Sequence, residues 1–255
     1  MDIKMALGMG AGAPPNDKRT LPTLRTVLRL DATDVTAEGD LRAAFEAERV
    51  EVLKDMKLDA KMRTLLEKEL LGLVGMRGKA RVSPRGIVSE SDFELPPNAS
   101  PSMRTQMDSL RDAIRQMYFP LPEEEIGKGG KWEVTSRVPA GGAFLDSRAT
   151  YTVTALDADS FQVNVNVALV APPNQKMSPK GMPPDTTATL DSMTGTSSGK
   201  ATCPLTRLIG TAAVQAATET VMTVTSETTG EKAQIYVVMD LTVAVRPTKA
   251  PAKKK

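Results

Sequence analysis

The sequence predicts an α+β fold: a strongly curved, half-barrel-like antiparallel β-sheet of about eight to eleven strands, with two helices packed on its concave face. Several segments alternate apolar and polar residues, which is the periodicity of half-buried strands. Two other segments carry apolar residues at helical spacing, and their apolar faces need a covering layer. We expect a single β-rich domain over residues 1–246, or two similar halves over 1–120 and 127–246, followed by a basic disordered tail over 247–255.

Strand periodicity begins with the first residues of the chain, at Ile3, Met5, Leu7 and Met9. Such an abrupt start leads us to expect a mature fragment whose targeting segment has been removed. Residues 22–53 then predict a long antiparallel hairpin, in which a change of phase near Arg49 indicates a bulge. Within this hairpin, Ala43–Arg49 taken alone also fits a helix. A shorter strand pair over 79–95 is expected to turn at Pro84-Arg85-Gly86.

Two segments predict helices. The first begins after Asp59, a favourable N-cap, and ends at Gly75. Its apolar face consists of Met62, Leu65, Leu66, Leu70, Leu73 and Val74. The second begins at Ser100, with Pro101 at the first helical position, and ends before Pro120. Its apolar stripe consists of Met103, Met107, Leu110, Ile114 and Met117.

The second half of the chain predicts strands and turns without helices. A hairpin over 149–169 is expected to turn at Asp157–Ser160. Residues 171–185 contain five prolines and predict a long mobile loop. A further turn is expected at Gly195–Gly199. The alternation over Ile235–Val245, with apolar residues on both faces, predicts a strand in the centre of the sheet.

The composition excludes several kinds of chemistry. The chain contains no histidine and one cysteine, which removes Ser-His-Asp and Cys-His catalysis, His-ligated metal sites and disulfides within one chain. A formal charge of +2 without an extended basic patch argues against nucleic-acid binding. We therefore expect no catalytic residue, no metal and no cofactor, and we expect that the protein is not an enzyme.

Short patterns that resemble functional sites lack the structural context that those sites require. The glycines over 8–12 precede a proline pair rather than a helix, so they do not predict a phosphate loop. The stretch Ser197-Ser198-Gly199-Lys200 matches a Ser-x-x-Lys pair but predicts a turn. We expect Cys203 to be a buried, inert thiol, Glu123–Glu125 a solvated acidic linker, and Asp157 a turn former.

The chain contains 14 methionines and few aromatic residues, and flexible thioether side chains suit an adaptable apolar surface. We expect an apolar groove between the sheet and the helices, lined by Met62, Leu66, Met103, Met107, Leu110, Ile114, Met117 and Met239. Its ligand would be a lipid or an acylated partner. Two alternatives stay open: these methionines form ordinary core, or the protein is a structural or scaffolding envelope protein that acts through protein–protein contacts.

Several stretches resemble those of one family of bacterial envelope proteins. They are Leu28-Arg29-Leu30-Asp31, Thr33-Asp34-Val35-Thr36, Gly86-Ile87-Val88, Leu121-Pro122-Glu123-Glu124 and Lys131-Trp132-Glu133-Val134. The family is an uncharacterised one, often of predicted lipoproteins, with no established activity and no catalytic residue to carry over. The resemblance implies an exported protein of the cell envelope or periplasm. We expect Lys253–Lys255 to form a solvated tail, or alternatively a peripheral contact with an anionic membrane surface.

Overall fold

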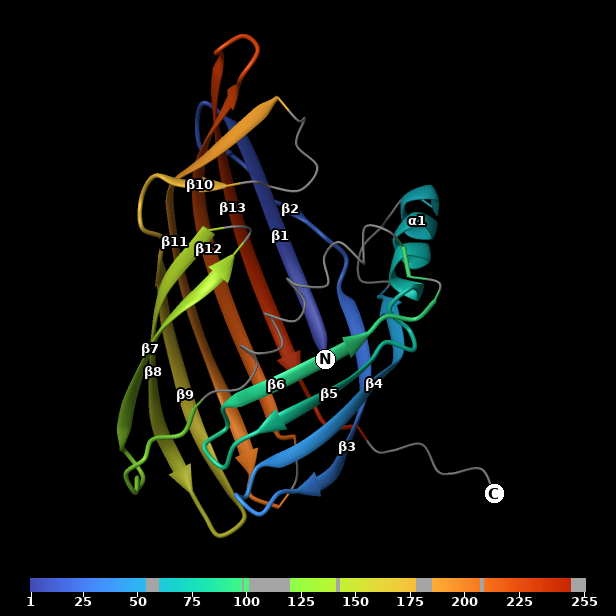
Figure 1. Ribbon diagram of the computed structural model, residues 1–255, viewed down its shortest axis with the longest axis vertical. Coiled ribbons are helices and arrows are strands. Elements are labelled where there is room, and N and C mark those ends of the chain that lie inside the picture. The colour runs from blue at the N-terminus through green and yellow to red at the C-terminus, as the bar shows by residue number, and fades with distance from the viewer. Residues whose placement is uncertain are drawn as a thin grey trace.

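One antiparallel β-sheet contains most of the chain in the computed structural model (Figure 1). The structure describes residues 1–53, 60–97, 99–100, 120–140, 143–177, 185–206 and 209–248. In the first half, the strands are β1 (Asp2–Ala11), β2 (Arg19–Thr20), β3 (Leu24–Val35), β4 (Leu41–Val52), β5 (Arg77–Val82) and β6 (Val88–Glu94), and the helix is α1 (Ala60–Leu71). In the second half, they are β7 (Lys131–Ala140), β8 (Ala143–Leu156), β9 (Ser160–Val170), β10 (Gln175–Met177), β11 (Thr186–Pro204), β12 (Thr211–Ser226) and β13 (Lys232–Val245).

Most neighbouring strands are consecutive in the chain, as in a meander, but the first strand and the last strand lie side by side in the middle of the sheet. The order is β6-β5-β4-β3-β1-β13-β12-β11-β9-β8-β7, and every neighbouring pair is antiparallel. The first strand, β1, therefore pairs with the last, β13, and the free edges are β6 and β7. Because ten antiparallel pairings separate them along this path, β6 and β7 run in the same direction, as their arrows in Figure 1 show.

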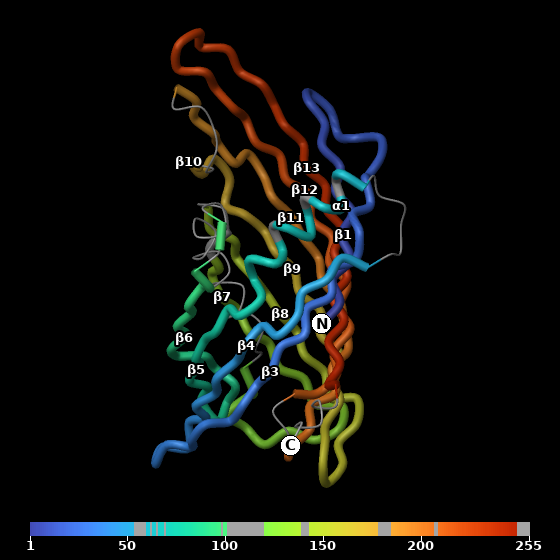
Figure 2. The backbone as a smooth tube through the Cα atoms, turned by 90° about the vertical axis from the view of Figure 1, so that its right-hand side faces the viewer, coloured from blue at the N-terminus to red at the C-terminus, as the bar shows by residue number. Residues whose placement is uncertain are grey.

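The sheet is strongly curved. Viewed from the side, β6 and β7 lie toward one side of the molecule and β13 lies toward the other (Figure 2). Side chains alternate between a buried and an exposed face: on β8, Ala149, Tyr151 and Val153 are buried whereas Arg148 is exposed. Since curvature brings the arms of the sheet toward one another, the buried set lines the concave side and the exposed set lines the convex side.

The core is made of small and medium-sized aliphatic side chains. On β4 and β5 it includes Ala43, Ala47, Val50, Val52, Ala80 and Val82. A second cluster joins Ala143 and Leu145 of β8 to Leu190 of β11 and to Ala171. Two aromatic pairs add to it: Phe45 with Phe93, whose ring centroids are 5.2 Å apart, and Trp132 with Tyr151, stacked at 4.9 Å.

The predicted α+β class is wrong. The described residues contain one helix, α1, and it lies beside the upper end of β4 rather than across the concave face (Figure 1). Arg63 of α1 contacts the Val52 carbonyl, but Leu71 is 58% exposed, so the apolar face of the helix is not fully covered. The second predicted helix, over 101–119, falls outside the described residues.

Another expectation that fails is the turn at Gly195–Gly199. The strand β11 runs through it without interruption and pairs with β9 and β12 on either side. A side chain at Gly199 would meet the Ala213 carbonyl oxygen at 2.7 Å and Val214 Cγ2 at 2.8 Å, so glycine here permits close strand packing rather than a turn. Small residues misled the prediction because turns and tightly packed strands both favour glycine.

Other local predictions are confirmed. The hairpin β3–β4 has two register shifts, one of them next to Arg49, where the bulge was expected, and no helix forms over Ala43–Arg49. The β5–β6 turn contains Gly86 at φ 75°, a conformation that glycine adopts freely. The last strand, β13, is central, since it lies between β1 and β12.

The loop predicted over 171–185 is wrong in part, because Gln175–Met177 form β10 and pair with β11. Residues 178–184 lie outside the described residues, so a mobile loop there stays a prediction.

Leu190 provides a direct test of the core. It is 1% exposed, and Leu190→Ala should lower the free energy of unfolding by about 2–5 kcal/mol, because it removes buried contacts and leaves a cavity. Leu205, which is 58% exposed, provides the control: Leu205→Ala should change it by less than about 0.5 kcal/mol. Urea denaturation followed by circular dichroism measures both. Equal effects of the two substitutions would contradict this placement of the core.

Candidate functional site

The central strands present apolar side chains on the concave side of the sheet, interrupted at β11 by Ser197 and Gly199. Across β1 and β13, the registered pairs are Ile3 with Val243, Met5 with Leu241, and Leu7 with Met239. The surface continues onto β12 at Val214 and Ala216 and onto β9 at Val165 and Val167, and all of these side chains are half-buried. We call this set the concave apolar face. Registered partners share one face of a sheet, so its side chains lie in adjoining rows.

The structure describes the positions of only some of the residues that were predicted to line the groove. Met239 lies on the concave apolar face, half-buried. Leu66 lies on α1, half-buried, and Met62 belongs to the same helix. The structure does not bring α1 and Met239 together, because α1 packs on β4 and two strands, β3 and β1, separate β4 from β13. The remaining predicted residues, Met103, Met107, Leu110, Ile114 and Met117, lie outside the described residues.

The sequence contained the signal for the concave apolar face but not for its assembly. The alternation of apolar and polar residues within β1 and within β13 is evident in the sequence, whereas the pairing of these two strands is not. Residues such as Met5 and Leu241 are more than 200 positions apart in the chain, and periodicity within a strand carries no information about its neighbour.

A groove with a volume of about 460 Å³ lies between the β5–β6 turn and the start of β7. We call it the edge groove; its lining is Arg85, Ile87, Pro120, Leu121, Pro122, Glu123, Glu124, Trp132, Glu133, Val134 and Thr135. The Leu121 N–H donates to the Arg85 carbonyl at 2.7 Å, and Arg85 Nε donates to the Leu121 carbonyl at 3.2 Å. Trp132 Nε1 donates to the Pro120 carbonyl at 2.8 Å. These bonds fix the 120–121 segment between the two edges of the sheet.

Charge at the edge groove comes from Arg85 and Glu123, which form an ion pair. Glu123–Glu125 had been expected to be a solvated acidic linker. The structure agrees for Glu124 and Glu125, which are exposed, but it gives Glu123 a partner from a distant turn. The pairing could not be predicted because Arg85 precedes Glu123 by 38 residues.

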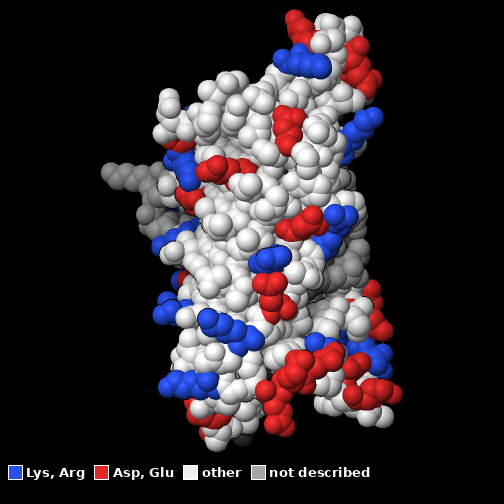
Figure 3. All heavy atoms as spheres, turned by 90° about the vertical axis from the view of Figure 1, so that its left-hand side faces the viewer, with Lys and Arg blue, Asp and Glu red and all other residues white. Residues whose placement is uncertain are grey.

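The convex face is shallow and mixes polar side chains with exposed apolar ones such as Phe144 and Val170. A larger depression, of about 630 Å³, crosses β8, β9, β11, β12 and β13, where Ala168, Thr196 and Ala217 are neighbours in register. It arises because these short side chains stand between longer ones such as Arg148 and Asp240. Figure 3 shows that most of the surface on the side of β7 and β8 is uncharged. The depression has no buried polar group to orient a ligand, so we regard it as solvated surface.

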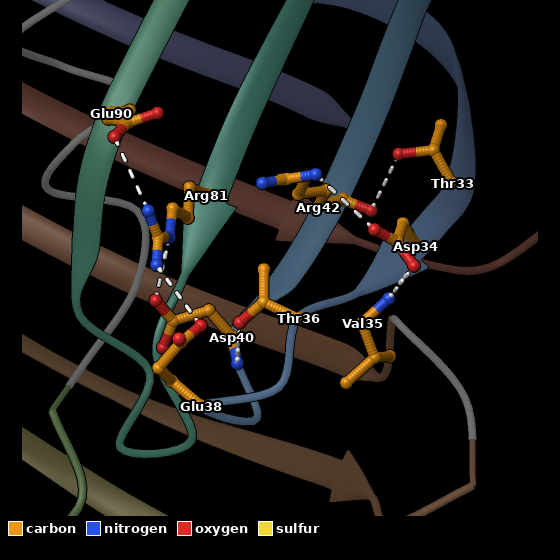
Figure 4. Close-up of polar contacts among 9 residues, drawn as sticks. All are labelled: Thr33, Asp34, Val35, Thr36, Glu38, Asp40, Arg42, Arg81 and Glu90. Atoms are coloured by element: carbon orange, nitrogen blue, oxygen red, sulfur yellow. Dashed lines mark hydrogen bonds and ion pairs between the residues drawn. The ribbon is translucent and has the colours of Figure 1, made fainter.

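A network of ion pairs crosses the convex side of β4, β5 and β6 (Figure 4). Arg81 Nε lies 2.7 Å from Asp40 Oδ2, and its other nitrogens lie 3.8 Å from Glu38 and 3.6 Å from Glu90. The hydrogen bond with Asp40 is the main cause that raises the pKa of Arg81, and a hydrogen bond from Thr36 is the main cause that lowers the pKa of Glu38. Each charge already has a partner, so the network ties strands together and offers no free ligand group.

Candidate catalytic groups do not assemble into a site in the described part of the chain. No group of three or more Asp, Glu or Cys side chains is placed there to hold a metal ion. Asp157 accepts hydrogen bonds from the Asp159 and Ser160 amides, which lowers its pKa and confirms its role in the turn. Ser197 and Lys200 lie on opposite faces of β11, because they are an odd number of residues apart. No described helix is long and apolar enough to span a membrane.

Comparison with known proteins gives a partial match. Residues 101–205, which include β7, β8, β9, β10 and β11 and most of the linker before them, match the model of a family described as "Family of unknown function (DUF6263)". The expected resemblance to an uncharacterised family is confirmed to that extent, and the description names no activity, compartment or lipid anchor. No curated protein matches the chain.

Among solved structures, a mutant of Rh. blastica porin is 8% identical to this chain. The comparison covers 96% of this chain and 98% of the porin chain, with a TM-score of 0.22. A TM-score this low is no evidence of a shared fold.

The environment of Cys203 predicts slow thiol chemistry. Cys203 is half-buried rather than fully buried as expected. Desolvation by this partial burial raises the pKa of the thiol to about 11, so it stays protonated at neutral and mildly alkaline pH, and the thiolate is the reactive form. Alkylation by iodoacetamide should therefore be much slower in the folded protein than in the urea-unfolded protein, and should accelerate as the pH approaches 11. Mass spectrometry of timed samples measures both rates. Equal rates in the folded and unfolded protein at mildly alkaline pH would contradict this environment.

Proposed function

We propose that this protein is a non-catalytic binder of an apolar ligand, a lipid or an acylated partner, which lies against the concave apolar face. The observation that carries the proposal is the half-buried state of this face: Met5, Leu7, Met239 and Leu241 adjoin one another and keep part of their surface open. The transfer of such adjoining apolar side chains out of water is favourable. A ligand that covers them would supply that burial.

The energetics favour a chain-like ligand. Burial of apolar surface contributes roughly 25 cal/mol per Å², or about 0.8 kcal/mol for each CH₂ group. A single acyl chain therefore gains useful affinity without any ion pair. The methionines at positions 5 and 239 suit such a ligand, because their unbranched side chains adjust to different chain shapes.

The absence of catalysis is part of this proposal. The chain has no histidine, and the pKa of its one cysteine is raised rather than lowered, so neither of the usual nucleophile–base arrangements is at hand.

A location in the cell envelope is also part of the proposed function. That part is supported by the resemblance of the stretches around Leu121-Pro122-Glu123-Glu124 and Lys131-Trp132 to envelope proteins.

A structural or scaffolding role is the second candidate. The packed cluster of Ala143, Leu145, Ala171 and Leu190 favours it, because it shows that one part of the concave side is filled by the protein itself. If the concave apolar face were covered in the same way, no ligand would enter. The two candidates differ in whether a folded protein takes up an acyl chain.

Titration with a neutral fluorescent acyl ester tests the proposal. We expect saturable binding that changes little between low and high salt, because screening weakens charge contacts and not apolar burial. Met239→Glu should abolish binding, since it places a charge on the concave apolar face. Thr242→Glu provides a matched control, because Thr242 lies on the same strand but on the convex face.

Circular dichroism of both variants shows whether they fold. If the folded wild-type protein binds no probe, the carrier function is wrong and the scaffolding role remains. If Thr242→Glu weakens binding as much as Met239→Glu does, the ligand does not lie on the concave apolar face.

A further inference from the structure

The edge groove joins a charged rim to an apolar wall. Arg85 and Glu123 form the rim, and their side chains are 43% and 73% exposed. Trp132, Val134 and Leu121 contribute apolar surface to the wall. A groove with these two parts fits an amphipathic molecule, with its polar end in water and its chain against the protein.

The apolar wall leads onto the concave side of the sheet. Trp132 of β7 stacks on Tyr151 of β8, its registered partner. Tyr151 is buried, with 7% of its surface exposed. Val134 is registered opposite Ala149, also buried, and Ala149 is registered opposite Val167 of the concave apolar face. Registered partners share a face, so a row of side chains connects the edge groove to Val167 of the concave apolar face.

The Glu123 carboxylate can be replaced at Arg85 by the carboxylate of a ligand. The Glu123 side chain is largely in solvent and the Arg85 side chain is partly so, and an exposed ion pair contributes little to stability. Arg85 also has a second anchor, since its Nε donates to the Leu121 carbonyl at 3.2 Å, so the guanidinium keeps its position when Glu123 leaves. An incoming carboxylate would take the place of the Glu123 carboxylate with the same charge and the same planar geometry.

We propose that Arg85 receives the carboxylate of a long-chain fatty acid, whose chain lies along Trp132 toward the concave apolar face. Glu123 neutralises Arg85 in the absence of the ligand and is displaced into solvent when it binds. This inference rests on the proposed function and names the ligand class and the position of its polar end. A carboxylate is preferred over other anions because a carboxylate is the group that Arg85 already holds.

Titration of dodecanoate and of dodecanol at neutral pH tests this assignment, because the two ligands differ in their head groups. Calorimetry gives the affinities, and the fluorescence of Trp132, the chain's one tryptophan, reports occupancy of the groove. The wild-type protein should bind the carboxylate about fivefold more tightly than the alcohol, the upper range for an exposed ion pair. Arg85→Met should remove this difference, because the carboxylate then loses the cation that the alcohol does not use. Glu123→Gln should raise the affinity for the carboxylate, because it removes the internal competitor.

Two further variants separate this role from a purely structural one. Arg85→Lys keeps the charge and should keep most of the preference for the carboxylate. Arg137→Met removes an exposed arginine of β7, one that pairs with Asp146, and should leave the preference unchanged. If Arg85→Met weakens both ligands equally, Arg85 only fastens the 120–121 segment and the inference is overturned.

The remaining outcomes distinguish the inference from the proposed function. If the wild-type protein binds dodecanol and dodecanoate equally, the carrier function stands and the role of Arg85 is overturned. If dodecyl phosphate binds much more tightly than dodecanoate, the assignment to a carboxylate is overturned. If no ligand binds, both proposals are overturned.

Discussion

The pairing of the first strand with the last is the constraint on which the rest of the structure depends. β1 and β13 are registered without interruption from Asp2 and Ala244 to Ala11 and Ile235. The start of β1 is held further by Arg25, which donates to both Asp2 carboxylate oxygens at 2.7 and 2.8 Å and thereby lowers the pKa of Asp2. Because the two ends of the chain meet at the centre of the sheet, its free edges must lie in the middle of the sequence.

The position of the edges explains the edge groove. β6 and β7 run in the same direction, and parallel strands cannot be joined by a tight turn; they require a long crossover connection. The last part of that connection, at Pro120 and Leu121, is bonded to Arg85 on one side and to Trp132 on the other. A charged rim and an apolar wall thus meet at the open edges of the sheet.

Paired charges and half-buried apolar side chains lie on opposite faces of the sheet. On the convex face, charges such as Arg81 and Asp40 pair with one another across neighbouring strands. On the concave face, side chains such as Met5 and Leu241 are apolar and half-buried. This division leaves a half-buried apolar surface on the concave side, on which the proposed ligand binding rests.

The sequence by itself determined the local structure: the alternation at Ile3–Met9, the bulge near Arg49, the turn at Asp157 and the central character of Ile235–Val245. Each of these depends on neighbours within a few residues, for which side-chain periodicity and turn chemistry are sufficient. The sequence also indicated Met239 as part of an apolar surface. Only the tertiary structure decided that β1 pairs with β13, that β11 passes through Gly195–Gly199, and that α1 does not cover the sheet. These features depend on contacts between distant segments, and register across strands is set by packing that no single segment encodes.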